Sequence, residues 1–155
     1  MAELTVDIDE IEERMEQADA VDRLAEVKKH FPTFKIKHQK LTQGKAQYGM
    51  YNRYRVTISN NEQTYEYTFN DSIANTQRGT MSNDFTMFHS LIVDAGCYEY
   101  CDSLEEFANE YGYDLYENRK QAEKAFNACR EEYEALIRLF GAEGYEILHA
   151  ISTNY

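Results

Sequence analysis

The sequence predicts an α+β fold, in which a small antiparallel sheet of about three strands packs against a helical C-terminal half, with an N-terminal helix alongside. Apolar residues recur at helical spacing over 7–30 and again over 84–140, and they alternate with polar residues over 54–69. At 155 residues, with 43% hydrophobic composition, the chain can form one domain with a sizeable core. We expect a single domain over 1–155, made of an N-terminal helical segment (1–30), antiparallel strands (31–71) and a mainly helical part (82–152).

The segment from Asp7 to His30 predicts an amphipathic helix. Its apolar residues lie three or four positions apart and change phase once: Ile8, Ile11, Met15 and Ala18, then Val21, Leu24 and Val27. The phase change predicts either a bend or two shorter helices. Pro32 closes the segment, because the residue before a proline avoids helical geometry.

The predicted strands follow this helix. Residues 34–41 alternate loosely, and Gln43-Gly44 is typical of a turn. Residues 54–58 and 65–69 alternate more regularly and indicate a hairpin. We place its turn at Asn60-Asn61, because asparagine tolerates the positive φ that tight hairpin turns require.

Two helices are predicted next. The first is capped by Ser82 or Asp84 and ends near Gly96. Its expected inner face is Phe85, Phe88, Leu91 and Ile92. The second begins at the capping box of Ser103 and Glu106 and stops at Gly112.

A long helix is expected from about Glu117 to Phe140, with Gly141 as its terminator. Its expected inward residues are Ala122, Ala125, Phe126, Cys129, Tyr133, Leu136 and Phe140. The last segment, from Gly144 to Ser152, fits either a short helix or an edge strand.

Charge is distributed very unevenly. Residues 62–118 hold twelve carboxylates and one base, Arg78, so this segment contributes −11 of the net charge of −12. Residues 28–61 hold eight bases and no acid. Carboxylates fixed on a folded surface repel nucleic acid and attract the basic grooves that hold it. One end of the fold should therefore be acidic, suited to a basic protein partner, and another end basic.

The candidate partner-binding residues come from the acidic segment and its neighbouring tyrosines. Asp102, Glu106 and Glu110 recur every four residues, which places them on one helix face about 6 Å apart along the axis. The alternative is an ordinary solvated face, although such faces usually mix both signs of charge. The full candidate set is Asp94, Glu99, Asp102, Glu105, Glu106, Glu110, Asp114, Glu117, Tyr98, Tyr100 and Tyr113.

Catalytic and cofactor-binding motifs are absent from the sequence. It contains no phosphate-binding glycine loop, no H-E-x-x-H and no calcium loop. Cys97 and Cys101 have a spacing that could supply two zinc ligands, with His89 and Cys129 as the possible completions. We expect packing cysteines instead, and hence no metal, no cofactor and no enzymatic activity.

The basic segment has an alternative of its own. Its bases are interleaved with Phe31, Phe34, Tyr48, Tyr51 and Tyr54, a composition that could bind single-stranded nucleic acid by stacking. The overall charge opposes such an approach, so we expect no direct nucleic-acid binding. A contact with the acidic half, or with an acidic patch on a partner, is the other interpretation.

Location follows from hydropathy and cysteine content. No apolar stretch approaches the ~20 residues that a membrane-spanning helix needs, and the first sixteen residues are acidic where a signal peptide is basic and then apolar. Three cysteines, an odd number, favour a reducing compartment. We expect a cytoplasmic protein with no membrane contact.

Three motifs carry a resemblance: Y-x-Y-x-F-x-D-S-I-x-N-T-x-x-G over 65–79, D-A-x-x-Y over 94–98 and E-E-F-A-x-E-Y-G-Y-D over 105–114. They resemble small acidic proteins encoded by phages and prophages, among which are proteins similar to anti-CRISPR inhibitors. The resemblance carries over no catalytic residues. It implies a protein in the cytoplasm of an infected bacterium that binds a CRISPR effector and blocks target DNA binding through an acidic surface.

The basic segment, 28–55, departs from a uniformly acidic decoy. It keeps a second interpretation open: a phage accessory or regulatory module that dimerises, or that binds a host transcription or replication protein through the sheet and the N-terminal helix. The target and the oligomeric state stay open in both interpretations.

Overall fold

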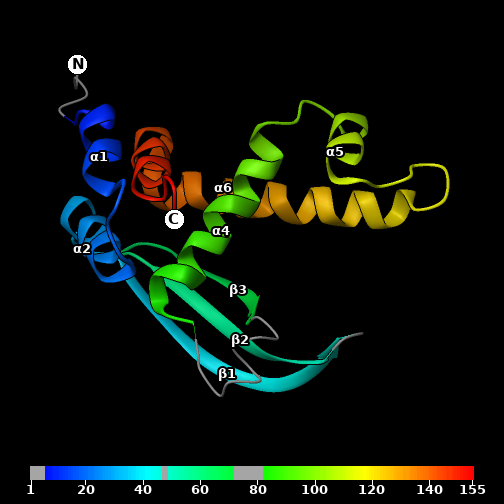
Figure 1. Cartoon of the computed structure of the whole chain (residues 1–155), viewed down its shortest axis with the longest axis horizontal. Helices are drawn as coiled ribbons and strands as arrows, with labels where there is room; N and C mark the ends of the chain where they lie inside the picture. The colour runs from blue at the N-terminus through cyan, green and yellow to red at the C-terminus, as the bar shows by residue number, and fades with distance from the viewer. Residues whose placement is uncertain (1–5, 47–48, 72–81) are drawn as a thin grey trace.

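The computed structural model describes residues 6–46, 49–71 and 82–155, without the side chains of 42–51. The fold is α+β, as predicted, with the sheet on one side of a group of helices (Figure 1). The elements are α1 (Ile8–Met15), α2 (Ala20–His30), β1 (Lys35–Ala46), β2 (Gly49–Ser59), β3 (Thr64–Asn70), α4 (Asp84–Glu99), α5 (Leu104–Tyr111) and α6 (Arg119–Ile151).

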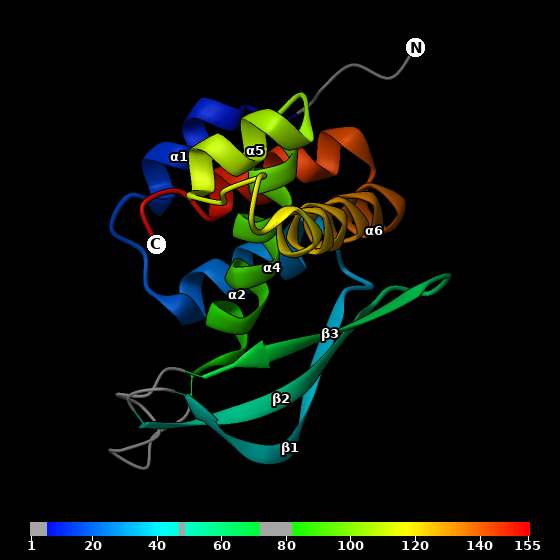
Figure 2. The same ribbon diagram turned by 90° about the vertical axis from the view of Figure 1, so that its right-hand side faces the viewer.

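The three strands form one antiparallel sheet in the order β1-β2-β3. Figure 2 shows the helices on one side of this sheet and none on its outer face. Alternation along the strands explains the arrangement, because Tyr54, Val56 and Ile58 are buried whereas Arg53 and Arg55 are exposed.

The phase change in the N-terminal segment marks two helices. Asp7 caps α1 and Asp19 caps α2, each by accepting a hydrogen bond from a backbone N–H three residues on. The expected inner face of α2 was partly wrong. Val21 is 75% exposed, whereas Arg23 is only 1% exposed. A charged side chain can replace an apolar one there because backbone carbonyls accept its hydrogen bonds.

The predicted turn at Gln43-Gly44 was wrong. β1 continues through both residues, and Gln43 pairs with Asn52 while Gly44 pairs with Tyr51. An irregularity between Lys40 and Gln43 adds one residue to β1 relative to β2. Glycine inside a strand often accompanies such a bulge, and local composition alone does not distinguish a bulge from a turn.

The hairpin lies where it was predicted, between Ser59 and Thr64, but the physical reason differs. Asn60 does not adopt a positive φ; among the described non-glycine residues only Asn154 does. Instead, Oδ1 of Asn60 accepts hydrogen bonds of 2.8 Å from the backbone N–H groups of Glu62 and Gln63. The side chain therefore holds the turn by mimicking a backbone acceptor.

The helical half follows the predicted order with small shifts. Asn83, between the two predicted candidates, caps α4, and the helix ends at Glu99, three residues beyond Gly96. Ser103 caps α5 as predicted, with a bond of 3.1 Å from the backbone N–H of Glu106. Gly112 ends α5 with φ +77°.

Gly141 ends the straight part of α6, as predicted, with φ 77° and ψ 168°. The chain then turns and continues as a second helical part to Ile151, so the segment from Gly144 to Ser152 is mainly helical and not an edge strand. The buried residues of this second part include Tyr145, Leu148 and Ile151.

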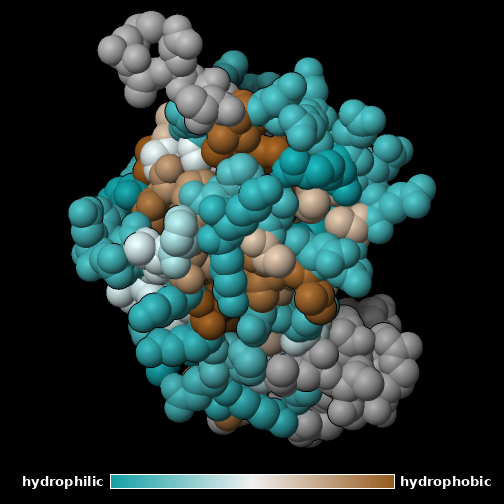
Figure 3. Space-filling model, turned by 90° about the vertical axis from the view of Figure 1, so that its left-hand side faces the viewer, coloured by the Kyte–Doolittle hydropathy of each residue, from teal (hydrophilic) through white to brown (hydrophobic). Residues whose placement is uncertain are grey.

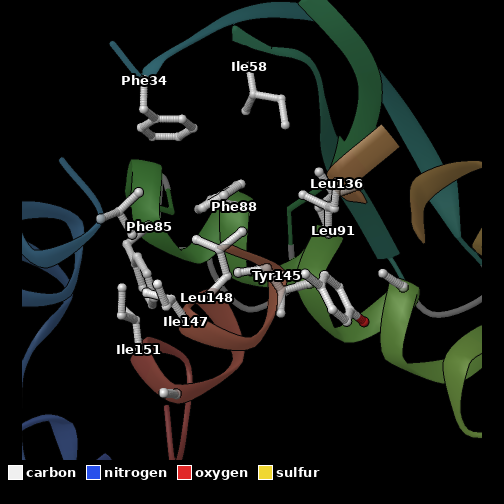
Figure 4. Packing of buried hydrophobic residues seen from close by; sticks show 14 of the residues in the cluster. Phe34, Ile58, Phe85, Phe88, Leu91, Leu136, Tyr145, Ile147, Leu148 and Ile151 are labelled. Carbon is white, nitrogen blue, oxygen red and sulfur yellow. The ribbon is translucent and has the colours of Figure 1, made fainter. Parts of the chain in front are cut away.

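The core lies between the sheet, α4 and both parts of α6. Figure 4 shows Phe34 and Ile58 facing Phe88, with Leu136 and Leu148 nearby. All of these are at most 3% exposed. α4 therefore occupies the centre of the molecule.

Figure 3 shows the side that carries α1 and α2, where hydrophilic side chains surround separate hydrophobic patches. No helix in the described part of the chain is long and apolar enough to span a membrane.

Candidate protein-binding surface

We call residues 102–118, which comprise α5 and its flanking loops, the acidic arm. It lies beside the first half of α6, at the end of the molecule away from α1 and α2 (Figure 1). The arm has no lysine or arginine. Its six carboxylates are all exposed: Asp102, Glu105, Glu106, Glu110, Asp114 and Glu117.

Aromatic packing fixes the arm to α6. Phe107 is 3% exposed, and its ring lies 5.2 Å from that of Phe126 on α6. The ring of Tyr113 stacks on the other side of Phe107 at 6.0 Å. This single apolar face holds α5, so its polar residues are directed into solvent.

The predicted row of three acidic residues is not a regular helical row. Asp102 precedes the N-cap, and only Glu106 and Glu110 lie within α5. The Glu106 carboxylate accepts a hydrogen bond of 2.8 Å from the backbone N–H of Asp102, the residue before the N-cap, and not from the N-cap Ser103 as in a standard capping box. The reason for the difference is that capping bends the chain before the helix begins.

One arm carboxylate approaches a base. Glu105 lies 4.0 Å from Arg119, at the start of α6, and Arg119 also approaches Glu123 at 3.5 Å. Among the described residues, no ion pair involves the other five arm carboxylates within 4.0 Å. Exposed pairs contribute little, so the arm keeps a strong negative field.

The remaining acidic residues of the predicted set lie elsewhere. Glu99 is exposed at the end of α4, whereas Asp94 is partly buried between α4 and α6 beside Glu132. Burial raises the pKa of Asp94. Asp71, which the charge count also included, is 2% exposed and accepts hydrogen bonds from Ser82. The acidic surface is therefore smaller than the acidic segment.

The predicted tyrosines differ in exposure. Tyr98 is partly buried, and its ring contacts those of Phe126 and Tyr133 on α6, so it mainly serves packing. Tyr100 is 70% exposed and is available to a partner.

Sequence reasoning missed Tyr116, which is 99% exposed in the loop before α6. The sequence did contain a signal for its exposure, because Tyr116 lies between Asp114 and Glu117 in a predicted loop. An aromatic residue there belongs to no apolar helix face that could be buried, and exposed tyrosines are common in interfaces.

The cysteines lie close to the arm but not on its surface. Cys101 is 8% exposed, and burial raises the pKa of its thiol, as do Glu106 and Glu110. Burial likewise raises the pKa of Cys129 to about 12. Within the described ranges, no group of three or more histidine, cysteine or acidic residues could hold a metal ion. Thiols in this setting are poor nucleophiles at neutral pH.

The outer face of the sheet is basic. Lys35, Lys37, Arg53 and Arg55 are exposed there, and Glu66 on β3 is their acidic neighbour. Among the aromatic residues expected to accompany these bases, Phe34 and Tyr54 lie in the core, each 3% exposed. Tyr48 and the side chain of Tyr51 lie outside the described part of the chain. Phe34 and Tyr54 are therefore not available for stacking against the bases of a single-stranded nucleic acid.

No family model, no curated protein and no solved structure matches this chain.

Proposed function

We propose that this chain is a non-catalytic inhibitor that binds a protein through its acidic arm. The proposed target is a bacterial CRISPR effector or a similar complex that uses a cationic channel to hold nucleic acid. The observation that supports this proposal is the arm itself: six exposed carboxylates, no base and one fully exposed tyrosine on a projecting helix and loop.

The physical basis is complementarity between the arm and a phosphate-binding groove. RNA-guided effectors hold DNA in positively charged channels and read bases with arginines. Arginine forms strong bidentate hydrogen bonds with carboxylates as well as with phosphates. An exposed tyrosine supplies rigid apolar area at low entropic cost, which is typical of residues that dominate interfaces.

The test is a triple variant, Asp102→Asn, Glu106→Gln and Glu110→Gln. If the arm faces a basic channel, affinity for the target should fall at least tenfold, which corresponds to about 1.4 kcal/mol. Folding should survive, because all three residues are exposed and Glu106→Gln keeps a side-chain oxygen that can accept the hydrogen bond from the backbone N–H of Asp102. Binding would be measured by surface plasmon resonance, and folding by circular dichroism.

The matched control removes the same three charges from another exposed place. Asp9→Asn, Glu13→Gln and Glu16→Gln change α1 and its C-cap residue, on the opposite side of the molecule; we call this variant the α1 control. This control should retain target affinity within about twofold, since only the long-range field changes. Equal loss in both variants, or no loss in the arm variant, contradicts the proposal.

A second candidate function follows from the outer face of the sheet. Four exposed bases on an uncovered antiparallel face could bind an acidic patch on a host transcription or replication protein, or on a second copy of this chain. Lys35→Glu combined with Arg55→Glu should abolish that interaction and leave the arm interaction intact.

A further inference from the structure

A pocket of about 600 Å³ opens where α1, the end of α4 and both parts of α6 meet. It lies outside the acidic arm. Ile8 and Ile137 contribute apolar walls, and the segment after Gly141 contributes Tyr145 and His149. None of the described residues that line it is a lysine or an arginine.

The pocket combines negative charge with aromatic rings. Glu12, Glu99 and Glu146 line it, and all three are exposed. The rings of Tyr133 and Tyr145 meet edge to face at 5.2 Å.

His149 and Tyr145 also meet edge to face, at 4.6 Å. Carboxylates around aromatic rings form a setting in which a cation gains both charge pairing and attraction to the ring faces.

Tyr145 gives an independent indication of a ligand. The residue is 3% exposed, and its hydroxyl oxygen is buried with no hydrogen-bond partner among the described residues. Figure 4 shows this hydroxyl on the side of the ring away from the other labelled core side chains. Burial and the nearby Glu99 carboxylate raise the pKa of Tyr145. By distance and angle, however, the Tyr145 hydroxyl forms no hydrogen bond with Glu99 or with any other described residue. An unpaired buried hydroxyl is costly and therefore uncommon in a folded protein.

His149 adds a second unpaired atom. Its Nε2 is buried and has no hydrogen-bond partner in the described part of the chain. Burial lowers the pKa of the ring, and Glu99 has the opposite effect on it. A neutral histidine with its proton on Nδ1 presents Nε2 as an acceptor. The pocket then offers acceptors of three kinds: carboxylate oxygens, a ring nitrogen and a phenolic oxygen.

We propose that this pocket binds the guanidinium side chain of an arginine presented by the partner protein. This inference rests on the proposed function for the source of the arginine. A guanidinium carries five donors and no acceptor, so it matches a pocket rich in acceptors. Its planar shape pairs with a carboxylate through two bonds while it lies against an aromatic ring. A lysine ammonium offers fewer donors and no plane.

Entry requires movement of a side chain at the rim. The two unpaired atoms are covered from water, and Tyr100 lies against His149 with ring centroids 6.4 Å apart. Tyr100 is 70% exposed, so few contacts hold it in place. We therefore expect rotation of the Tyr100 ring to admit the guanidinium to Nε2 of His149 and the Tyr145 hydroxyl.

The experiment titrates the full chain with N-acetyl-arginine N-methylamide and follows amide resonances by NMR. We expect saturable shifts around Tyr145 and His149 with a dissociation constant of about 1 mM, in keeping with a ligand of this size. The citrulline analogue, which has nearly the same shape and no charge, should not saturate. The lysine analogue should bind at least threefold more weakly. Equal binding of the arginine and citrulline probes, or of the arginine and lysine probes, overturns the assignment.

Two variants complete the test. Tyr145→Phe removes only the unpaired hydroxyl and should weaken probe binding at least threefold. Because Tyr145 is buried, the exposed residue Glu146 supplies a second variant that does not depend on core packing: Glu146→Gln should also weaken binding at least threefold. Glu143→Gln is the matched control, since Glu143 is exposed on the same helical part and does not line the pocket. Equal effects of Glu146→Gln and Glu143→Gln overturn the proposal.

The outcome is separable from that of the arm. The probe needs no partner protein. If it fails to bind, the proposal of an arginine pocket is contradicted and the proposal for the arm is unaffected. Loss of target binding in the α1 control as well as in the arm variant removes the arm proposal and leaves the pocket to be judged by the probe alone.

Discussion

Nη1 of Arg23 on α2 donates a hydrogen bond of 2.8 Å to the carbonyl oxygen of Ile151, the last residue of α6. The same guanidinium donates to the carbonyl oxygens of Met15, Ala18 and Thr153. One buried charge therefore connects α1, α2 and the C-terminal segment. Carbonyl oxygens from four places in the chain replace the water that this charge loses on burial.

We predict that Arg23→Met destabilises the protein by about 3 kcal/mol, because buried carbonyl groups lose their donor. The melting temperature should fall by roughly 6–12 °C for a chain of this size. Arg130→Met is the control: Arg130 is exposed and pairs with Glu134 at 3.8 Å, so its loss should cost less than about 0.5 kcal/mol. Thermal unfolding followed by circular dichroism measures both. Equal shifts of the melting temperature in the two variants would show that the hydrogen bonds of Arg23 do not stabilise the fold.

A second buried relationship concerns Asp94 on α4 and Glu132 on α6. Burial, followed by the charge of Asp94, raises the pKa of Glu132 to about 8, and burial also raises the pKa of Asp94. Two carboxyl groups this close cannot both ionise without repulsion, so the pair retains a proton at neutral pH.

The raised pKa of Glu132 determines how the stability of the protein depends on pH. Between about pH 4.3, where an unfolded glutamate titrates, and about pH 8, the folded state binds more protons than the unfolded state. Stability should therefore fall as the pH rises through this range and level off above it. Urea unfolding at pH 5.5, 7 and 8.5 tests this expectation.

Glu132→Gln should flatten that dependence and raise stability at pH 8.5 by the order of 1 kcal/mol, because a neutral amide removes the repulsion. Glu143→Gln, an exposed change, should leave the slope unaltered. A slope that persists unchanged in Glu132→Gln would assign the pH dependence to other groups.

Two glycines with the same φ of 77° allow a matched comparison. Gly112 has ψ 25°, in the left-handed helical region that asparagine tolerates, whereas Gly141 has ψ 168°, in a region accessible essentially to glycine alone. No atom lies within 4 Å of a Cβ placed at either position. We predict that Gly141→Asn costs about 2 kcal/mol and Gly112→Asn less than about 1 kcal/mol. Chemical denaturation measures the difference, and equal costs would contradict a backbone origin.

The spacing of apolar residues in the sequence correctly predicted the helices that have one apolar face and one polar face. α4 and α5 lie where the spacing placed them, because the burial of Phe88 and Phe107 needs only a continuous helical stripe. Burial of Arg23 could not be predicted in this way. Its acceptors come from residues 15, 18, 151 and 153, and no local pattern brings them together.

The candidate surface was predictable in charge but not in shape. The sequence places carboxylates densely before α6, yet burial removes Asp71 from the surface and covers part of Asp94. Only tertiary packing decides which acidic residues remain exposed. The pocket was not predictable, because Glu12, Glu99 and Glu146 come from three separate helices.

The last prediction concerns how the acidic arm acts. A protein that occupies a DNA channel must compete with DNA, so the order of addition should matter. Incubation of an RNA-guided effector with this protein before DNA should abolish DNA binding in a mobility-shift assay, whereas addition after the DNA complex has formed should do little.

Complex formation should also weaken between 50 and 200 mM salt, because exposed charges are screened over a Debye length of about 8 Å at physiological ionic strength. The salt dependence of binding should be weaker in the arm variant, which keeps three of the six arm carboxylates, and nearly unchanged in the α1 control. If the protein instead binds the DNA-loaded effector equally well and blocks only cleavage, the arm does not replace phosphate. The basic outer face of the sheet, with Lys37 and Arg55, then becomes the first surface to mutate.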